Sequence, residues 1–208
     1  HLDKDTRDDG NIFDDNLHPD HSWKKITKKS SLIIKRSIDI AWSSLALLCV
    51  APVFAAIAIG IKTTSPGPVF FRQERLGLNG KRFMFLKFRS MYTDNDPRSH
   101  KEFVRKLIED SKKSSADSVV YKITDDPRIT PFGRFLRKSS LDELPQFINV
   151  FMGEMSLVGP RPPIPYECDM YDVWHKRRLL SCKPGITGLW QVTGRSTTTF
   201  DEMVRMDL

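Results

Sequence analysis

The sequence predicts an α+β domain attached to a membrane, and three observations lead to this prediction. The first is Ile40–Ile61, a run of about 22 residues without charge. The second is a pair of β-forming segments separated by Asn79-Gly80, a residue pair favoured in tight turns. The third is the part from Pro131 onwards, where helical stretches alternate with proline and glycine. We therefore expect a membrane helix, a small β-hairpin and helices along the membrane surface.

Composition limits the class of protein. The chain of 208 residues is long enough for one domain with a core. Its formal charge is +7, and residues 1–22 carry −5, so the remainder carries +12. A domain this basic favours nucleic acid, anionic lipid or a phosphorylated substrate as partner. The three scattered cysteines fit neither a disulfide framework nor a zinc site, which favours a reducing compartment.

Three parts of the chain differ in composition. Residues 1–29 begin with an acidic stretch poor in apolar residues, which predicts a flexible linker. The chain starts with His1 rather than Met, so we expect the linker to follow a missing upstream region. Residues 30–63 contain the apolar run, and residues 64–208 form the predicted globular domain.

The apolar run is long enough to span a membrane as a helix. However, Pro52 lies at its midpoint, where it removes a helix hydrogen bond. Both flanks are also basic, with Lys35, Arg36 and Asp39 before the run and Lys62 after it. The positive-inside rule therefore does not select an orientation. A helix that bends near the proline and returns to the same face fits both observations, and a kinked span is the alternative.

Basic residues cluster beside aromatic residues in two places. The hairpin is predicted over Val69–Arg75 and Arg82–Ser90, with Lys87 and Arg89 on one face. The second cluster contains Arg128, Arg134, Arg137 and Lys138, of which the last three share one face of a helix. Each could simply be solvated, but together beside a membrane segment they favour phosphate or anionic lipid.

Two adjacent carboxylates, Asp142 and Glu143, follow this basic cluster. One interpretation is structural: Ser140 and Glu143 fit a capping box, while Pro145 suits a helix capped by Asp142. The other is chemical, because a positive helix end and nearby guanidinium groups favour an ionised carboxylate. An ionised Asp can bind Mg²⁺ or attack phosphorus to form an acyl phosphate.

Two further motifs offer polar groups. Arg161 lies between prolines in Gly159-Pro-Arg-Pro162, so its backbone is stiff and its guanidinium suits bidentate phosphate binding. A simple rigid loop is the alternative for this motif. The glycine-punctuated loop over residues 184–196 carries Gln191 and Arg195, and it lacks the Gly-Lys-Ser/Thr ending of a P-loop. The five histidines show no paired spacing for catalytic zinc.

Five motifs in fixed order resemble the bacterial sugar transferase family. They are SPGPVFFRQERLG, FLKFRSM, DPRITPFGRFLRKSSLDELPQFINV, GEMSLVGPRP and KPGITGLWQVTGRS, and the resemblance covers nearly everything from about residue 30 to 208. Members are monotopic phosphoglycosyl transferases that act on polyprenyl phosphate. The sequence is most similar to the larger type, the undecaprenyl-phosphate galactose and glucose phosphotransferases, which carry membrane helices and a soluble domain upstream.

The resemblance implies a role for each matching residue. Asp142 would be the nucleophile that takes hexose 1-phosphate from UDP-galactose or UDP-glucose, with Glu143 completing the dyad. UMP leaves, and undecaprenyl phosphate then attacks the covalent intermediate. Arg137 and Arg161 match the phosphate-binding arginines, and Mg²⁺ would bind at Asp142 with Asp207 as a further acidic residue. The other candidate substrate-binding residues are Lys87, Arg89, Arg128, Gln191 and Arg195.

The resemblance also implies a place in the cell. The family's re-entrant helix hairpin matches residues 35–61, with Lys35, Arg36 and Asp39 at its base and Pro52 at the break. The family often has Ser before this proline, where Ala51 stands here. A cytosolic catalytic domain would lie on the cytoplasmic face of the bacterial inner membrane. There it would carry out the first membrane step of O-antigen, capsule or exopolysaccharide synthesis, and the larger type makes a homodimer plausible.

The chain stops at Leu208, where the family pattern continues with aromatic residues. We therefore expect the domain over residues 64–208 to be incomplete at its C-terminus. Two other classes of function remain open. One is a non-catalytic membrane scaffold of polysaccharide machinery. The other is a membrane-tethered nucleic-acid binder, which the sequence does not favour because it lacks a recognisable reading module.

Overall fold

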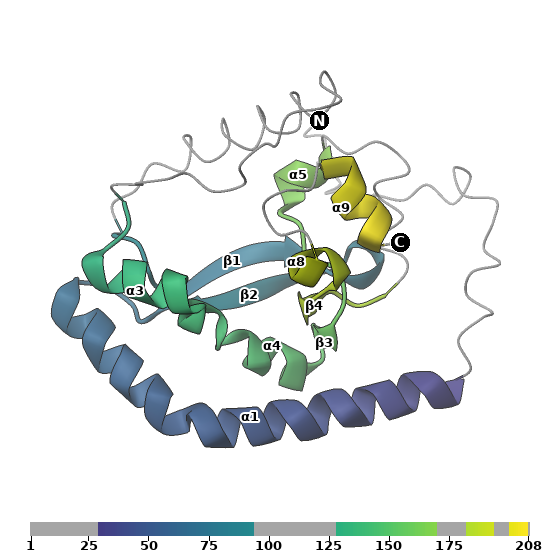
Figure 1. The fold of residues 1–208 in the computed structure, drawn as a ribbon, viewed down its shortest axis with the longest axis horizontal. Helices are drawn as coiled ribbons and strands as arrows, with labels where there is room; N and C mark the ends of the chain where they lie inside the picture. The colour runs from purple at the N-terminus through teal and green to yellow at the C-terminus, as the bar shows by residue number, and fades with distance from the viewer. Residues whose placement is uncertain (1–28, 94–127, 170–181, 194–199, 208) are drawn as a thin grey trace, which may run out of the picture.

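The computed structural model describes residues 29–93, 128–169, 182–193 and 200–207. A long helix comes first, followed by an antiparallel hairpin, and then by short helices with a second small pair of strands. Figure 1 shows the long helix along the bottom of the molecule, with the other elements above it. This mixture of helices and strands confirms the α+β class. Nearly all of the predicted linker, residues 1–29, lies outside the described residues.

The apolar run forms helix α1, Lys29–Thr64, which is 36 residues long. Pro52 lies inside it, where the missing N–H group removes one hydrogen bond, and Figure 1 shows α1 bent in its middle. By length and composition, α1 is the one helix among the described residues that could cross a membrane. Many of its large apolar side chains are exposed, such as Leu48 at 75% and Ile59 at 65%. A surface this apolar favours a location in the membrane.

The predicted hairpin is confirmed. Strand β1, Phe70–Leu76, pairs antiparallel with strand β2, Arg82–Phe88. The connection contains the short helix η3, Leu78–Gly80, and is therefore longer than a two-residue turn. Asn79 and Gly80 have φ angles of 58° and 71°, in the left-handed region that Asn and Gly adopt most readily.

Three short helical elements follow one another along the next part of the chain. Helix α3, Pro131–Ser139, begins after Thr130, whose hydroxyl accepts the Gly133 amide at 2.8 Å. It is followed by the one-turn helix η4, Leu141–Glu143, and by helix α4, Gln146–Met152. No side chain caps η4 or α4, so both predicted capping arrangements are wrong. Ser140 stands between α3 and η4 with φ 58° and makes no side-chain cap, and the residue before α4 is Pro145 instead of Asp142.

A second pair of strands is parallel and very short. Strand β3, Ser156–Val158, lies beside strand β4, Gly185–Thr187. A Cβ atom on Gly185 would lie 2.1 Å from the amide nitrogen of Gly159, so only glycine allows this approach. The pair therefore brings the two proline- and glycine-rich motifs together. The described residues end with helices α5, Pro165–Asp169, α8, Leu189–Thr193, and α9, Phe200–Asp207.

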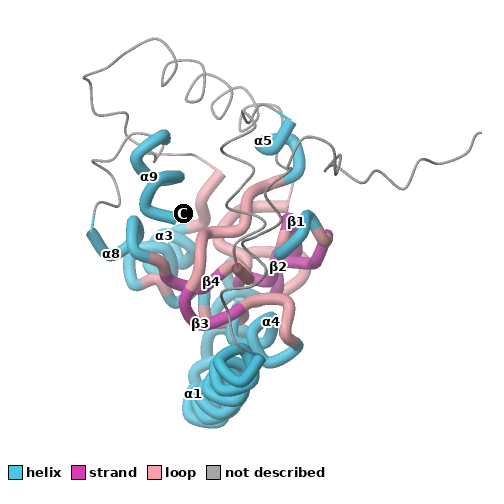
Figure 2. Tube along the Cα trace, turned by 90° about the vertical axis from the view of Figure 1, so that its right-hand side faces the viewer, coloured by secondary structure: helices cyan, strands magenta, loops and turns pink. Residues whose placement is uncertain are grey.

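Both ends of α1 contact the body of the protein. Near its start, Arg36 donates hydrogen bonds to the carbonyl oxygens of Val150 and Phe151, at 2.7 and 2.8 Å, at the end of α4. Near its end, Ile57 and Ile61 are buried in a core cluster with residues of β2 and α3. Figure 2 shows α1 nearly end-on, with α4 next to it. Both halves of α1 therefore contact the same body.

Candidate active site

The candidate site is built where β2 meets the elements around α4. The side-chain amide of Asn149 donates to the Met84 carbonyl oxygen at 2.8 Å, and its oxygen accepts the Leu86 amide at 3.1 Å. Asn149 is 1% exposed, so these bonds are shielded from water. They fix α4, and the one-turn helix η4 before it, against the strand that carries Lys87.

Lys87 lies between the two predicted catalytic carboxylates. Its Nζ is 2.7 Å from Glu143 Oε1 and 3.9 Å from Asp142 Oδ2. Asp142 is 6% exposed, so its carboxylate lies where water screens charge poorly. The two carboxylates therefore differ in their pairing. Glu143 forms a close ion pair with Lys87, while Asp142 lies near Lys87 without a direct hydrogen bond to it.

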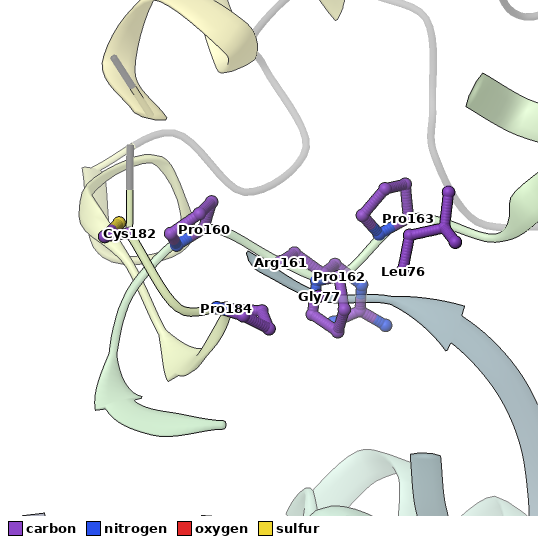
Figure 3. A pocket seen from close by; sticks show the side chains of 8 residues that line it. All are labelled: Leu76, Gly77, Pro160, Arg161, Pro162, Pro163, Cys182 and Pro184. Atoms are coloured by element: carbon purple, nitrogen blue, oxygen red, sulfur yellow. The ribbon is translucent and has the colours of Figure 1, made fainter. Parts of the chain in front are cut away.

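Arg161 joins the same group from a distant part of the chain. Its Nη1 lies 3.7 Å from Glu143 Oε1. Figure 3 shows Arg161 among the prolines of its loop, near Leu76 and Gly77 at the end of β1. The structure thus brings Lys87, Asp142, Glu143 and Arg161 together from three separate motifs.

The two carboxyl groups differ in acidity because their surroundings differ. Burial raises the pKa of Asp142 above its usual value, although the charges of Lys87 and Arg137 oppose this. Burial also acts to raise the pKa of Glu143, but Lys87 and Arg161 outweigh it and lower that pKa to about 2. Burial, with the charge of Arg161, lowers the pKa of Lys87. Neighbouring groups whose pKa values are pushed apart are typical of sites where each has a separate chemical role.

Residues 30–208 match the model of the family described as bacterial sugar transferase. The chain belongs to this family. The prediction made from the five motifs is therefore confirmed.

Relatives of this bacterial sugar transferase have informative names. The chain is 44% identical over 185 residues to galactosyl transferase CpsE of Streptococcus agalactiae. It is 40% identical over 185 residues to undecaprenyl-phosphate galactose phosphotransferase of Salmonella typhimurium. It is 43% identical over 176 residues to UDP-glucose:undecaprenyl-phosphate glucose-1-phosphate transferase of Escherichia coli. These alignments cover 88%, 88% and 82% of the chain, but only 39%, 37% and 34% of the relatives.

The other predicted substrate-binding residues of the transferase have different surroundings. Arg137 lies in the last turn of α3, and its charge acts to lower the pKa of Asp142. Arg89 is 5% exposed and donates to the carbonyl oxygens of Ser65 and Pro66, at 2.6 and 2.7 Å. These bonds assign Arg89 to the turn that follows α1. These bonds explain why Arg89 is buried, and no contact with a substrate is needed for that explanation.

Arg128 and Gln191 also lie within the described residues. The carbonyl oxygen of Arg128 accepts the Tyr92 amide at 2.9 Å, in the segment that leads into α3. The side-chain amide of Gln191, in α8, donates to the Ile186 carbonyl oxygen at 3.2 Å. Neither of these bonds reaches the dyad. Arg195, the last predicted residue of this set, lies outside the described residues.

The predicted Mg²⁺ site depends on which carboxylates lie near one another. The sequence predicts Mg²⁺ at Asp142 with Asp207, which ends α9 and lies close enough to Cys182 for its charge to affect that thiol. Among the residues that the structure describes, no three His, Cys, Asp or Glu side chains come together as a metal cluster. Mg²⁺ usually binds one or two carboxylates together with substrate phosphates and water. Asp142 offers one carboxylate for an ion of this kind, and the Mg²⁺ site at Asp142 and Asp207 stays a prediction.

The predicted membrane-flanking residues hold α1 to the catalytic body. Asp39 is 4% exposed and accepts hydrogen bonds from the Ser156 hydroxyl and the Leu157 amide, both at 3.0 Å. Lys35 donates to the same hydroxyl at 2.5 Å and to the Val158 carbonyl oxygen at 3.2 Å. Together with the bonds of Arg36, these contacts attach the start of α1 to β3 and α4.

Sequence reasoning missed a buried polar stripe beside the dyad. Gln146 and Asn149 are 2% and 1% exposed, and the side-chain nitrogen of Gln146 has no hydrogen-bond partner among the described residues. Glu143, Gln146 and Asn149 are spaced three residues apart in an otherwise apolar stretch. Polar residues at this spacing share one helix face, and buried polar side chains need partners. This spacing was the signal that could have found them.

Proposed function

We propose that the protein transfers hexose 1-phosphate from a UDP-sugar to undecaprenyl phosphate and releases UMP. The observation that carries this proposal is the different pairing of the two dyad carboxylates. Glu143 is bound to Lys87 at 2.7 Å, whereas Asp142 is buried, only loosely paired and flanked by cations. A carboxylate in this state is suited to attack phosphorus. The relatives named as galactose and glucose phosphotransferases support UDP-galactose or UDP-glucose as the donor.

In the first half-reaction, an Asp142 carboxylate oxygen attacks the phosphorus that carries the sugar. The new bond joins this oxygen to phosphorus, and the bond to the bridging oxygen of the diphosphate breaks, so that UMP leaves with that electron pair. Lys87 and Arg161 lie within 4 Å of the dyad carboxylates and would neutralise the diphosphate charge. Phosphoryl transfer depends mainly on such positioning and neutralisation.

In the second half-reaction, a phosphate oxygen of the lipid attacks the same phosphorus. The bond between phosphorus and Asp142 breaks, which restores the carboxylate and leaves a sugar diphosphate on the lipid. Two half-reactions let one site serve a water-soluble donor and then a membrane-bound acceptor. When bound, Mg²⁺ would supply further charge neutralisation, held by Asp142 and the donor diphosphate.

We infer further that α1 enters the membrane and returns to the same side. Its start is bound to α4 and β3 through Arg36 and Asp39, and its end is buried against β2 and α3. Since both ends contact one body, a straight crossing would pull this body to opposite sides of the membrane. The bend at Pro52 supports re-entry, with the catalytic body on the cytoplasmic face of the inner membrane.

The reaction would be an early membrane step in making a surface polysaccharide, since other relatives are named exopolysaccharide production proteins. A homodimer, expected for the larger type, stays a prediction. UMP release tests the function: the full-length protein in detergent receives UDP-galactose or UDP-glucose, undecaprenyl phosphate and Mg²⁺. We expect repeated turnover that depends on the lipid with one donor, and at most one UMP per protein molecule without lipid. Folded protein that releases UMP with neither donor would favour the scaffold alternative.

A further inference from the structure

Arg161 lies in a segment rich in proline, with Pro160 before it and Pro162 and Pro163 after it. A proline nitrogen carries no hydrogen, so these residues cannot donate backbone hydrogen bonds. The segment therefore depends on donors elsewhere in the protein that reach its carbonyl oxygens. The groups that supply these donors therefore fix the position of the Arg161 backbone, from which its side chain extends.

Among the described residues, three donors reach carbonyl oxygens of this segment, and one of them is a side chain. Two are backbone amides, which donate to Pro160 at 2.9 Å and to Pro163 at 3.0 Å. The third is Arg75 at the end of β1, whose Nη1 donates to the Pro162 carbonyl oxygen at 2.7 Å in a buried bond. Pro162 directly follows Arg161, so this bond restrains the residue next to the phosphate-binding arginine.

Arg75 is itself held in place. It is 9% exposed, and Gln73 Oε1 accepts hydrogen bonds from its Nε at 3.2 Å and its Nη2 at 2.8 Å. Its guanidinium lies 5.3 Å from the centre of the Phe85 ring, and the Lys87 amine lies 5.5 Å from the same ring. Arg75 and Lys87 therefore share one aromatic support, which connects the proline segment to the dyad.

We propose that Arg75 is a positioning residue for donor binding, which holds Pro162 and thereby places the Arg161 guanidinium at the diphosphate. This assignment rests on the proposed function. Lysine cannot replace Arg75 fully, because the planar fork reaches Pro162 and Gln73 at once. The rival explanation is that Arg75 only stabilises the fold, in which case its effects would be independent of Arg161.

A double-mutant cycle on UDP binding separates these explanations. The affinity of the full-length protein for UDP with Mg²⁺ is measured in detergent for Arg75→Lys, Arg161→Ala and the double variant. We expect Arg161→Ala to weaken binding by about 10- to 100-fold and Arg75→Lys by about 10-fold. The double variant should bind no more weakly than Arg161→Ala, because Arg75 acts through Arg161. Arg82→Lys, an exposed arginine paired with Glu74 on the same hairpin, should bind UDP normally.

Gln73→Leu provides a second variant in case Arg75→Lys does not fold. It removes the acceptor that orients Arg75, and we expect it to weaken UDP binding. In the Arg161→Ala background, Gln73→Leu should cause no further weakening. Additive losses, or unchanged binding in the Arg75 and Gln73 variants, would overturn the assignment while the proposed function stands. A wild-type protein that does not bind UDP would overturn both.

Discussion

Lys87 lies 2.7 Å from Glu143 but 3.9 Å from Asp142, although the two carboxylates are adjacent in the sequence. Glu143 thereby becomes a paired anion whose pKa is about 2, while burial raises the pKa of Asp142. The fixed anion orients the cations, and the other carboxylate is left to react. The predictions below follow from this division.

Activity should fall at acid pH as Asp142 becomes protonated. Burial raises the pKa of Asp142, so its reactive, ionised form is present above that raised pKa and is lost as the pH falls through it. Lys87 opposes this shift, and Lys87→Met should therefore move the acid limb of kcat/KM to higher pH. The measurement is UMP release over a pH series. An acid limb that stays in place in Lys87→Met would show that Asp142 does not set it.

Glu143→Gln should change the pH profile in the opposite direction. The charge of Glu143 contributes to the raised pKa of Asp142, so its removal should move the acid limb to lower pH. Because Lys87 and Arg161 lose their shared partner, turnover at neutral pH should also fall, by about 100-fold. UMP release over the same pH series measures both effects. Full turnover in this variant would contradict the orienting role of Glu143.

Asn149→Leu should destabilise the protein by releasing α4 from β2. The Asn149 side chain makes partly buried hydrogen bonds to Met84, Leu86 and, at 2.6 Å, to Glu154. Their loss should cost about 2–3 kcal/mol and lower the melting temperature in detergent. The matched control is Glu74→Gln, which breaks an exposed ion pair with Arg82 and should change stability by less than about 1 kcal/mol. Equal melting temperatures for the two variants would contradict this account of α4.

Labelling should find both ends of α1 on one side of the membrane. Ser30→Cys and Thr63→Cys place thiols at exposed positions near the two ends of the helix. In sealed vesicles of either orientation, a membrane-impermeant maleimide should label both variants or neither, with the wild-type protein as background. Labelling of the two ends from opposite sides would establish a kinked span in place of re-entry.

Much of the fold could be predicted because its signals are local. The apolar run, the Asn79-Gly80 pair and each single motif lie within short stretches of sequence. The parallel pair of β3 and β4 could not be predicted, since each strand has three residues and they lie far apart in the chain. No periodicity exists in a strand this short.

The site was predicted in part for the same reason. Asp142 and Glu143 follow a basic cluster, and this context suggests chemistry. By contrast, the sequence does not say that Arg89 bonds to the turn at Ser65, or that Arg75 holds the segment of Arg161. These assignments depend on contacts between residues that are distant in the chain, which only the folded structure brings together.

The most direct test of the central claim is the intact mass of the protein after exposure to the donor. Wild-type protein and Asp142→Asn are incubated with UDP-galactose or UDP-glucose and Mg²⁺, without lipid acceptor, and their masses are compared. The proposed mechanism predicts a hexose phosphate adduct on the wild type, absent from Asp142→Asn and discharged when undecaprenyl phosphate is added. Lipid-dependent turnover by Asp142→Asn at the wild-type rate, or an adduct that persists in this variant, would contradict Asp142 as the nucleophile.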